Sequence, residues 1–332
     1  DVVIEFDWQI EKFILMFAFV VATAFSALYS VSEEKSFLSF MRESNQFYTG
    51  DEYNLRLGVY TANARRVLEF NREGKTFEVA LNKFAAYTPA EYKSLLGART
   101  SNKVVRPSLK TSTVSVPESF DWREKNVVYA VKDQAQCGSC WAFSIIAAQE
   151  SAWAIAKGEL ISLSEQNIVD CVTSCYGCNG GWPYKAYDYV IKKQGGKFMK
   201  EEDYPYKAVD QSCKFDASKA VTMIKSYVSV KSGSESDLKE KVATKGVASI
   251  CIDASNWSFQ MYSKGIYDES SCSSYNLDHA VNCVGYGSEN GVDYWIVRNS
   301  WGTSWGENGY IRMIRNKNNQ CGEASEAIVP LD

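Results

Sequence analysis

Residues 134–144, QAQCGSCWAFS, decide the fold, because Cys137 and Cys140 form a C-x-x-C pair in front of an apolar run. Such a pair occurs as a redox-active dithiol, as half of a zinc site, or as a structural cysteine beside a nucleophilic one. Residues 139–158 contain no proline and end at Gly158, which predicts a long helix starting at the pair. Cys140 then lies in the first helical turn, where the helix dipole favours a thiolate.

The composition indicates a globular protein whose second part is oxidised. The chain has 332 residues, of which 45% are hydrophobic and 23% charged, and its net charge is −4. No Lys/Arg-rich run stands out, so we expect no nucleic-acid partner. All ten cysteines lie between Cys137 and Cys321. This distribution favours disulfides in an oxidising compartment over a reduced cytosolic protein with buried thiols.

Residues 1–32 predict a secretory signal region. Residues 13–32 carry no charge, and their most apolar part, residues 13–25, is short for a membrane span. Ala22-Thr23-Ala24 then resembles a signal cleavage site. A signal anchor is the alternative. The preceding residues are acidic and the first is not Met, so the true start, at residue 1 or at Met16, stays open.

Residues 33–97 predict a small helical domain. In residues 52–71, six side chains separated by 4, 4, 3, 4 and 4 positions share one helical face. They are Glu52, Arg56, Tyr60, Asn63, Val67 and Asn71. The plain interpretation is a surface helix, but a polar row beside Tyr60 and Val67 favours a helix held by hydrogen bonds. A short alternating strand and a helix opening at Thr88-Pro89 follow. Residues 98–115 are rich in Ser, Thr and Lys and predict an exposed linker that proteases can cut.

From residue 116 onward the sequence has a different pattern, in which helices are expected first and strands follow. After the helix at 139–158, helices are expected around residues 165–171 and 183–193. After about residue 221, β-rich segments predominate. The order predicts an α+β fold with a helical lobe at about 125–222 and a strand lobe at about 223–325.

The chain has one histidine, His279, so it is the one candidate for a histidine general base. Alone beside a strand it would more often be structural, but a two-lobed fold can bring it to Cys140. The other meanings of the C-x-x-C pair have no support. A dithiol oxidoreductase would need a βαβ context, and a zinc site would need a second ligand pair, whereas Cys175 and Cys178 have an unsuitable spacing. We expect no metal and no cofactor.

Five segments in this order resemble the papain family of cysteine peptidases, in its cathepsin L-like branch, over about residues 33–332. They are PESFDWR (117–123), QAQCGSCWAFS (134–144), CNGGWP (178–183), LDHAVNCVGYG (277–287) and VRNSWGTSWGENGYIRM (297–313). The helical face at 52–71 is similar to a prosegment motif of this branch, with Tyr60 where Phe is usual and Val67 where Ile is usual. The resemblance implies a papain-like peptidase at 116–332, made of a helical left domain and a β-barrel-like right domain, and an N-terminal inhibitory prodomain at 33–97.

The resemblance also implies an endopeptidase made as an inactive zymogen. Cys140 would be the nucleophile, and His279 would form an ion pair with its thiolate and protonate the leaving amine. Asn299 would orient the imidazole, and Trp301 would shield that hydrogen bond from water. Gln134 would donate to the oxyanion together with the backbone N–H of Cys140. A binding protein that has lost catalysis is the alternative, but it would usually lack one of these residues.

A cleft between the lobes would bind an extended peptide on the backbone of Gly180 and Gly181. The resemblance implies further substrate-binding residues: Trp182, Pro183, Cys251, Leu277, Asp278, Trp301 and Glu326. Glu326 would form the floor of the pocket for the second residue before the cut, P2, so bulky apolar residues and Arg are expected there. The alternatives are that Glu326 is a solvated surface residue, or that Glu323 takes its position.

The resemblance pairs Cys137 with Cys178, Cys171 with Cys213, and Cys272 with Cys321. Cys175 has no obvious partner, and a bond to Cys171 or Cys178 is the alternative. Cys283 is expected to be a small buried side chain.

Ala80, Asn82, Phe84 and Ala86 resemble the second prosegment motif, G-x-N-x-F-x-D. Ala86 replaces its carboxylate, which puts in doubt an acid-triggered release that depends on it. Activation would cut near residues 110–115. Asn256-Trp257-Ser258 is a weak glycosylation sequon. The expected partners are peptide and protein substrates, the chain's own prodomain and cystatin-like inhibitors. We expect a monomer of the secretory pathway, lysosomal or vacuolar or secreted.

Overall fold

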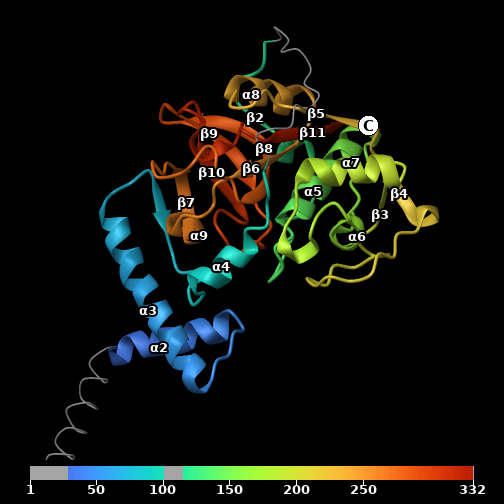
Figure 1. Cartoon of the computed structure of the whole chain (residues 1–332). Helices are drawn as coiled ribbons and strands as arrows, with labels where there is room; N and C mark the ends of the chain where they lie inside the picture. The colour runs from blue at the N-terminus through green and yellow to red at the C-terminus, as the bar shows by residue number, and fades with distance from the viewer. Residues whose placement is uncertain (1–28, 101–114, 332) are drawn as a thin grey trace, which may run out of the picture. The chain divides into compact units, whose positions relative to one another are not determined.

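The structure, a computed structural model, describes residues 29–100 and 115–331. Most of the expected signal region, residues 1–28, and most of the expected linker, residues 101–114, lie outside the described residues. The described chain forms two compact units. One contains residues 29–66 and Ala85–Tyr87, and the other contains residues 67–84, 88–100 and 115–331 (Figure 1). No helix in the described ranges is long and apolar enough to cross a membrane.

The first unit is built on helix α2 (Val31–Glu43) and most of helix α3 (Gly50–Arg72). Ser30 caps α2 in a capping box: its hydroxyl accepts from the Glu33 N–H, and the Glu33 carboxylate accepts from the Ser30 N–H. The helix therefore begins two residues before position 33, where we expected the prodomain to start.

The polar row on α3 forms the hydrogen bonds that its spacing predicted. Arg56 donates to the carbonyl of Ala86 at 2.9 Å, and Asn63 donates to the carbonyl of Ala85 at 2.8 Å. The Tyr60 hydroxyl lies 2.7 Å from that of Ser36 on α2. These bonds tie α3 to the rest of its unit, so the prediction of a helix held by specific polar contacts is confirmed.

The second unit begins with the end of α3, strand β1 (Phe77–Val79) and helix α4 (Pro89–Leu95). Asn71 donates to the carbonyl of Val79 and accepts from its N–H, at 2.8 and 3.0 Å, which continues the polar row of α3. Thr88 caps α4, and Pro89 occupies the first turn, where a missing N–H costs nothing.

Three helices form the helical lobe: α5 (Cys140–Lys157), α6 (Glu165–Cys171) and α7 (Pro183–Lys193). Most residues of α5 are buried on every side, as an all-round apolar helix requires. It lies between the large sheet and the helices α6 and α7 (Figure 1). A left-handed Gly158, with φ of 73°, ends α5 where the sequence predicted. A two-stranded sheet of β3 (Lys197–Met199) and β4 (Ala220–Met223) completes this lobe.

The strand lobe is a nine-stranded, mainly antiparallel sheet in the order β1-β7-β10-β9-β8-β6-β11-β5, with β2 paired to β8. Its further strands are β2 (Phe120–Asp121), β5 (Ser226–Ser229), β6 (Ala248–Ile252), β7 (Tyr262–Tyr267), β8 (His279–Glu289), β9 (Val292–Arg298), β10 (Tyr310–Ile314) and β11 (Ala327–Leu331). The short helices are α8 (Glu235–Thr244), α9 (Trp257–Gln260), η1 (Trp122–Lys125), η2 (Gly177–Asn179), η3 (Ala217–Lys219) and η4 (Gln320–Gly322). The sheet thus continues beyond position 325, where we expected it to end, because β11 pairs with β5 and β6.

Disulfides join Cys137 to Cys178, Cys171 to Cys213, and Cys272 to Cys321. Cys137 is therefore not half of a reactive dithiol with Cys140. Cys175 is buried and forms no disulfide, so its alternative bond to Cys171 or Cys178 is absent.

Candidate active site

The start of helix α5 meets the start of strand β8 where the two lobes join. Cys140 is the first residue of α5, and His279 is the first residue of β8. Asn282 on β8 donates to the carbonyl of Ser144 on α5 at 2.7 Å, which fixes the two elements against each other. Ala280, the residue after His279, packs with Cys140 in one buried cluster. The structure therefore brings Cys140 and His279 together.

The orientation of the His279 ring is set by two residues from the segment after β9. His279 Nε2 lies 2.8 Å from Asn299 Oδ1, and an amide oxygen can only accept, so Nε2 carries the proton. Nδ1 is buried and has no hydrogen-bond partner among the described residues, which leaves it available for proton exchange. The Trp301 indole stacks on the imidazole with ring centroids 4.8 Å apart and planes inclined by 26°. Trp301 is itself buried, so water has little access to the hydrogen bond.

Gln134 is fully buried and its amide is held in one orientation. Its Oε1 accepts from the Ser300 hydroxyl at 2.7 Å, and its backbone N–H donates to the Ser300 carbonyl at 2.9 Å. Nε2 therefore points its protons the other way, toward the carbonyls of Cys137 and Leu95, each at 2.9 Å. Sequence reasoning missed Ser300, although its place directly after Asn299 was a usable signal.

Residues 97–99, at the end of the expected prodomain and the start of the expected linker, run extended between the two lobes, with an isolated β-bridge from Ala98 to Gly181. On the sheet side, Ala98 donates to the carbonyl of Asp278 at 2.9 Å. On the other side, Gly181 donates to the Gly97 carbonyl at 2.9 Å, and Arg99 donates to the Gly181 carbonyl at 2.8 Å. Gly180 has φ of 103°, and a Cβ there would lie 2.6 Å from the Gly97 oxygen, so a side chain would obstruct the strand.

The side chain of Ala98 occupies an apolar pocket next to Cys140. Cys251, Leu277 and Ala280 pack around it. Cys251 also donates from its backbone N–H to the carbonyl of Glu326 at 2.9 Å, so Glu326 lies beside this pocket.

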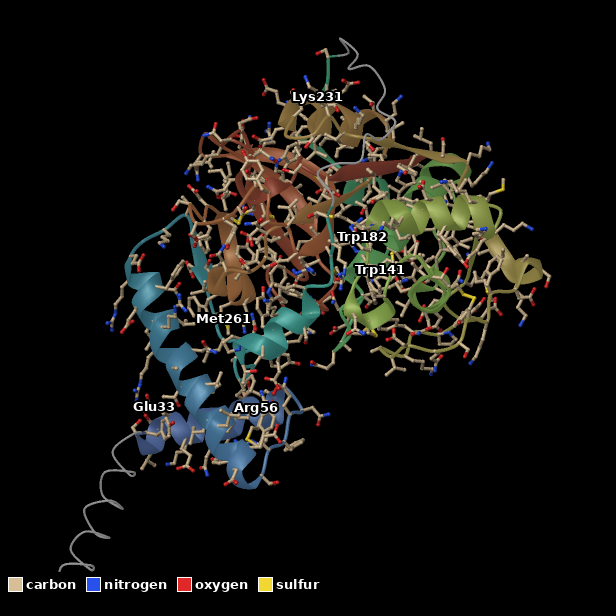
Figure 2. The ribbon with its side chains drawn as sticks, in the orientation of Figure 1. Glu33, Arg56, Trp141, Trp182, Lys231 and Met261 are labelled. Carbon is tan, nitrogen blue, oxygen red and sulfur yellow. A yellow bond between two sulfur atoms is a disulfide. The ribbon has the colours of Figure 1, made fainter. Side chains whose placement is uncertain are left out.

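Two other residues expected in the pocket, Trp182 and Pro183, lie in the helical lobe. Trp182 packs against the core of the helical lobe, near Trp141, and Pro183 begins helix α7 (Figure 2). Glu323, the alternative to Glu326, is completely buried, and its carboxylate oxygens find no hydrogen-bond partner in the described chain. Burial raises the pKa of Glu323 well above its ordinary value.

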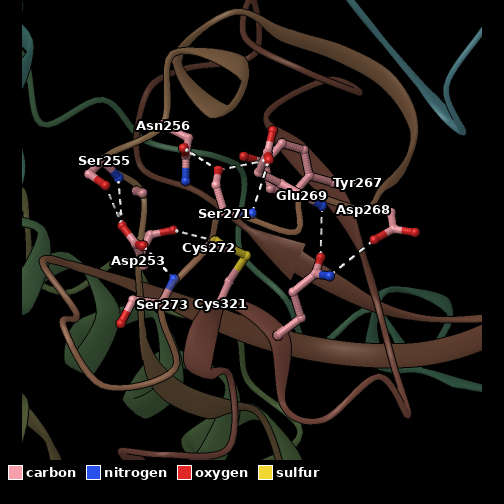
Figure 3. Close-up of a disulfide and its surroundings, with 12 residues drawn as sticks. Asp253, Ser255, Asn256, Tyr267, Asp268, Glu269, Ser271, Cys272, Ser273 and Cys321 are labelled. Carbon is pink, nitrogen blue, oxygen red and sulfur yellow. Dashed lines mark hydrogen bonds between the residues drawn. A yellow bond between two sulfur atoms is a disulfide. The ribbon is translucent and has the colours of Figure 1, made fainter.

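The loop that leads to His279 is fixed by a disulfide and by Asp253 (Figure 3). The Cys272 sulfur, which is bonded to Cys321, lies 3.3 Å from the Asp253 carbonyl oxygen, and the Asp253 carboxylate accepts from the backbone N–H of Ser273 at 2.7 Å. The Asp253 N–H in turn donates to the Cys321 carbonyl at 2.9 Å. These contacts hold the chain that carries Leu277, Asp278 and His279 and so define one wall of the pocket.

The electrostatics of the site follow from its burial. Burial raises the pKa of Cys140 to about 12, although the backbone N–H groups of Ala280, Gly97 and Trp141 oppose it. Burial also lowers the pKa of His279 to about 4. With residues 95–99 in the groove, the site therefore holds a neutral thiol and a neutral imidazole. This differs from the thiolate that the helix dipole favours, because removal of water outweighs the dipole.

Comparisons with known proteins agree with this architecture. The model of the family described as "Papain family cysteine protease" matches residues 116–331. The model described as "Cathepsin propeptide inhibitor domain (I29)" matches residues 37–92. The chain is 45% identical to digestive cysteine proteinase 1 of Homarus americanus over 290 residues, covering 84% of this chain and 89% of the relative. It is 41% identical to cathepsin L1 of Drosophila melanogaster over 336 residues, covering 96% and 90%. The structure of digestive procathepsin L 3 of Tenebrio molitor larval midgut superimposes with a TM-score of 0.83 at 36% identity, covering 92% of this chain and 100% of that one.

Proposed function

Since the chain belongs to the papain family of cysteine proteases, we propose that Cys140 is its nucleophile, with His279 as acid–base and Asn299 as the residue that positions His279. The protein is a cathepsin L-like cysteine endopeptidase with its own propeptide as inhibitor. One observation carries the residue assignment. His279 Nε2 is held by Asn299 Oδ1 at 2.8 Å, while Ala280, the residue after His279, packs with Cys140 in one buried cluster.

The chemistry begins with an ion pair. Transfer of the thiol proton from Cys140 to His279 Nδ1 gives a thiolate, which attacks the carbonyl carbon of the scissile peptide. The imidazolium then protonates the leaving amine as the C–N bond breaks, which leaves a thioester. Neutral His279 then takes a proton from a water molecule as the water oxygen bonds to the thioester carbon. The C–S bond breaks, the acyl product leaves as a carboxylic acid, and the imidazolium returns the proton to the Cys140 sulfur. Asn299 suits its role because its oxygen accepts from Nε2 and does not titrate.

Gln134 supplies a donor for the oxyanion of the tetrahedral intermediate. Its Nε2 already donates to a peptide carbonyl, that of Leu95, at 2.9 Å. The bond from Ser300 to its oxygen keeps this donor directed into the site, and a donor that needs no reorganisation is the kind that accelerates acyl transfer. The backbone N–H of Cys140, at the start of α5, is the second proposed donor.

The propeptide suppresses this chemistry in two ways. Residues 97–99 occupy the backbone hydrogen bonds of Gly181 and Asp278 that an extended substrate would use. Their presence also removes water, which disfavours the ion pair by raising the pKa of Cys140 and lowering that of His279. We infer that departure of the propeptide frees the groove and restores the charged pair together.

Replacement of the nucleophile tests the assignment. Cys140→Ala should abolish hydrolysis of a fluorogenic peptide by the activated enzyme while its circular dichroism and melting temperature stay close to those of the wild type. Cys283→Ala is the matched control, because Cys283 is also a completely buried cysteine outside any disulfide, but lies within strand β8. Activity that persists in Cys140→Ala, or vanishes in both variants, would contradict the assignment.

We also propose that Glu326 gives the P2 pocket its acceptance of Arg beside bulky apolar residues. The support is its backbone contact with Cys251, whose side chain lines the pocket around Ala98. Ala98 occupies this pocket in the full-length chain, so a substrate side chain can enter only after Ala98 leaves. Because Ala98 is small, the pocket lining must also move apart to accept a larger side chain. A charge-assisted bond from an arginine contributes about 1.5–3 kcal/mol, or roughly a factor of 10 to 150 in rate.

Glu326→Gln should therefore lower kcat/KM for a peptide with Arg at P2 by at least about tenfold and leave a Phe peptide little changed. Glu323→Gln is the control, because it makes the same change at the completely buried neighbour. An equal loss on both peptides, or the selective loss in Glu323→Gln instead, would refute the role of Glu326.

Partners and location follow from the same features. The groove that takes residues 97–99 as a strand should also take the extended inhibitory segment of a cystatin-like protein. All proposed reacting groups come from one chain, which supports action as a monomer. Three disulfides support a lysosomal, vacuolar or secreted location along the secretory pathway.

A further inference from the structure

Tyr206, in the coil after strand β3, contacts both chain segments that carry the proposed oxyanion donors. Its hydroxyl lies 2.8 Å from the backbone carbonyl oxygen of Gln134. The same hydroxyl lies 2.6 Å from that of Ser139, the residue directly before Cys140. One side chain of the helical lobe therefore joins the segment of the side-chain donor to the segment of the backbone donor.

The ring of Tyr206 is held in place, so its hydroxyl has a defined position. The backbone N–H of Tyr206 donates to the Glu201 carboxylate at 2.8 Å. The ring meets Phe143 of helix α5 edge to face, with centroids 4.9 Å apart and planes inclined by 89°. A ring fixed in this way gives up little freedom when its hydroxyl forms hydrogen bonds.

The number of protons gives each of these hydrogen bonds its direction. A carbonyl oxygen can only accept, so the single hydroxyl proton of Tyr206 goes to Gln134. The bond between the two hydroxyls is then donated by Ser139. The other acceptor near Ser139, the Cys137 carbonyl, lies farther away, at 3.4 Å. Burial raises the pKa of Tyr206, so the phenol keeps its proton at neutral and mildly alkaline pH.

The bond to Tyr206 gives Ser139 a different role from that of an ordinary helix cap. A serine before the first turn usually accepts from a backbone N–H of the helix, whereas Ser139 has φ of −101° and ψ of 14° and its side chain caps none of the described N–H groups. The peptide group between Ser139 and Cys140 carries the proposed backbone donor. Tyr206 therefore helps to orient this peptide from outside helix α5.

Gln134 is held from both lobes. Ser300 of the strand lobe bonds to its side-chain oxygen and to its backbone N–H, and Tyr206 of the helical lobe bonds to its carbonyl. The Cys137 N–H also reaches this carbonyl, but at 3.4 Å, so the bond from Tyr206 is the shorter one. Loss of the Tyr206 hydroxyl would loosen Gln134 on the side of the helical lobe.

We propose that Tyr206 is a positioning residue of the oxyanion hole, which aligns the Gln134 side chain and the Cys140 backbone N–H through its hydroxyl. This inference rests on the proposed function and adds a residue to it. Donors that are aligned in advance stabilise the oxyanion of the tetrahedral intermediate more than the substrate carbonyl. The hydroxyl should therefore contribute to kcat and not to KM.

Tyr206→Phe tests this role, because phenylalanine keeps the ring contact with Phe143 and removes only the hydroxyl. In the activated enzyme, kcat for a fluorogenic peptide amide should fall about three- to tenfold, with KM nearly unchanged. Tyr204→Phe is the matched control. Tyr204 is buried in the same coil, and its hydroxyl donates to the Asp170 carboxylate at 2.7 Å. This control should lower the melting temperature and leave kcat unchanged.

The rate at which iodoacetamide alkylates Cys140 gives a readout that general damage to the site would change. Alkylation needs the thiolate but forms no oxyanion, so its rate and pH dependence in Tyr206→Phe should match those of the wild type. Ser139→Ala removes the hydroxyl that bonds to Tyr206. It should also lower kcat without changing alkylation, and it supplies the test if Tyr206→Phe does not fold.

A wild-type kcat in Tyr206→Phe, an equal fall in kcat and in the alkylation rate, or the same fall of kcat in Tyr204→Phe would overturn the positioning role. Each of these results leaves the assignment of Cys140 as nucleophile standing. Failure of that assignment would show differently, as hydrolysis that persists in Cys140→Ala.

Discussion

Replacing Phe84 by alanine should loosen the propeptide over the active site without unfolding the protease. Phe84 is 2% exposed, and its ring meets Trp301 edge to face with centroids 5.1 Å apart. Burial of 150–250 Å² of phenylalanine surface at about 25 cal/mol per Å² is worth about 4–6 kcal/mol, and measured Phe→Ala costs are about 3–5 kcal/mol. Because Phe84 joins the propeptide to Trp301, most of this loss falls on the covered state. The equilibrium between covered and open sites should shift about 10²- to 10⁴-fold.

The assay is the rate at which iodoacetamide labels Cys140 in the full-length chain, followed by peptide mass mapping. The rate should rise in Phe84→Ala by a factor within that range. Phe198→Ala is the control: Phe198 is equally buried, but it lies in the core of the helical lobe and not under the propeptide. It should lower the melting temperature and leave labelling nearly unchanged. A wild-type labelling rate in Phe84→Ala, or an equal increase in Phe198→Ala, would refute the reasoning.

Two further predictions concern buried polar groups of the protease. Gln134→Ala should lower kcat about 10²- to 10³-fold in steady-state assays, because it removes a preset oxyanion donor, whereas a change confined to KM would contradict that role. Lys132 Nζ lies 2.8 Å from the buried carboxylates of Glu150 and Glu165, so Lys132→Met should lower the free energy of unfolding by about 3–5 kcal/mol in urea titrations at pH 7. Burial raises the pKa of Glu165 from 4.5 to about 8, so its stabilising contribution is complete below pH 4.5 and is lost as pH rises through about 8. At pH 9 Glu165 is ionised and depends on the charge of Lys132, whereas at pH 5 it is neutral. Lys132→Met should therefore lower the free energy of unfolding more at pH 9 than at pH 5, and an equal loss at both would refute this explanation.

The sequence predicted the elements whose pattern is set by their own residues. The run at 139–158 became α5 because an uninterrupted apolar helix can only be buried, and the polar row on α3 found backbone partners. Helix α8 was missed because its face is mostly charged, although Leu238 and Val242 are spaced as an apolar pair and are both buried. Strand β11 was missed because only pairing with distant strands distinguishes it from a C-terminal coil.

The ionisation of the site could not be predicted from local sequence. The position of Cys140 at a helix start favours a thiolate, and that argument holds for a hydrated site. In the full-length chain, residues far upstream close the groove, so burial reverses the balance for both Cys140 and His279. The contacts of Leu95, Gly97 and Arg99 with the groove depend on where α4 ends, and no spacing in the sequence encodes that position.

The most direct test of the account is the pH dependence of Cys140 labelling before and after removal of the propeptide. In the full-length chain, labelling should increase only in strongly alkaline solution, toward pH 12, because burial holds the thiol neutral. In the enzyme freed of its propeptide, labelling should already occur between about pH 4 and 7, as for a cysteine paired with His⁺, and His279→Ala should abolish this acidic component. The same pH profile in both forms, or labelling at a cysteine other than Cys140, would contradict the account.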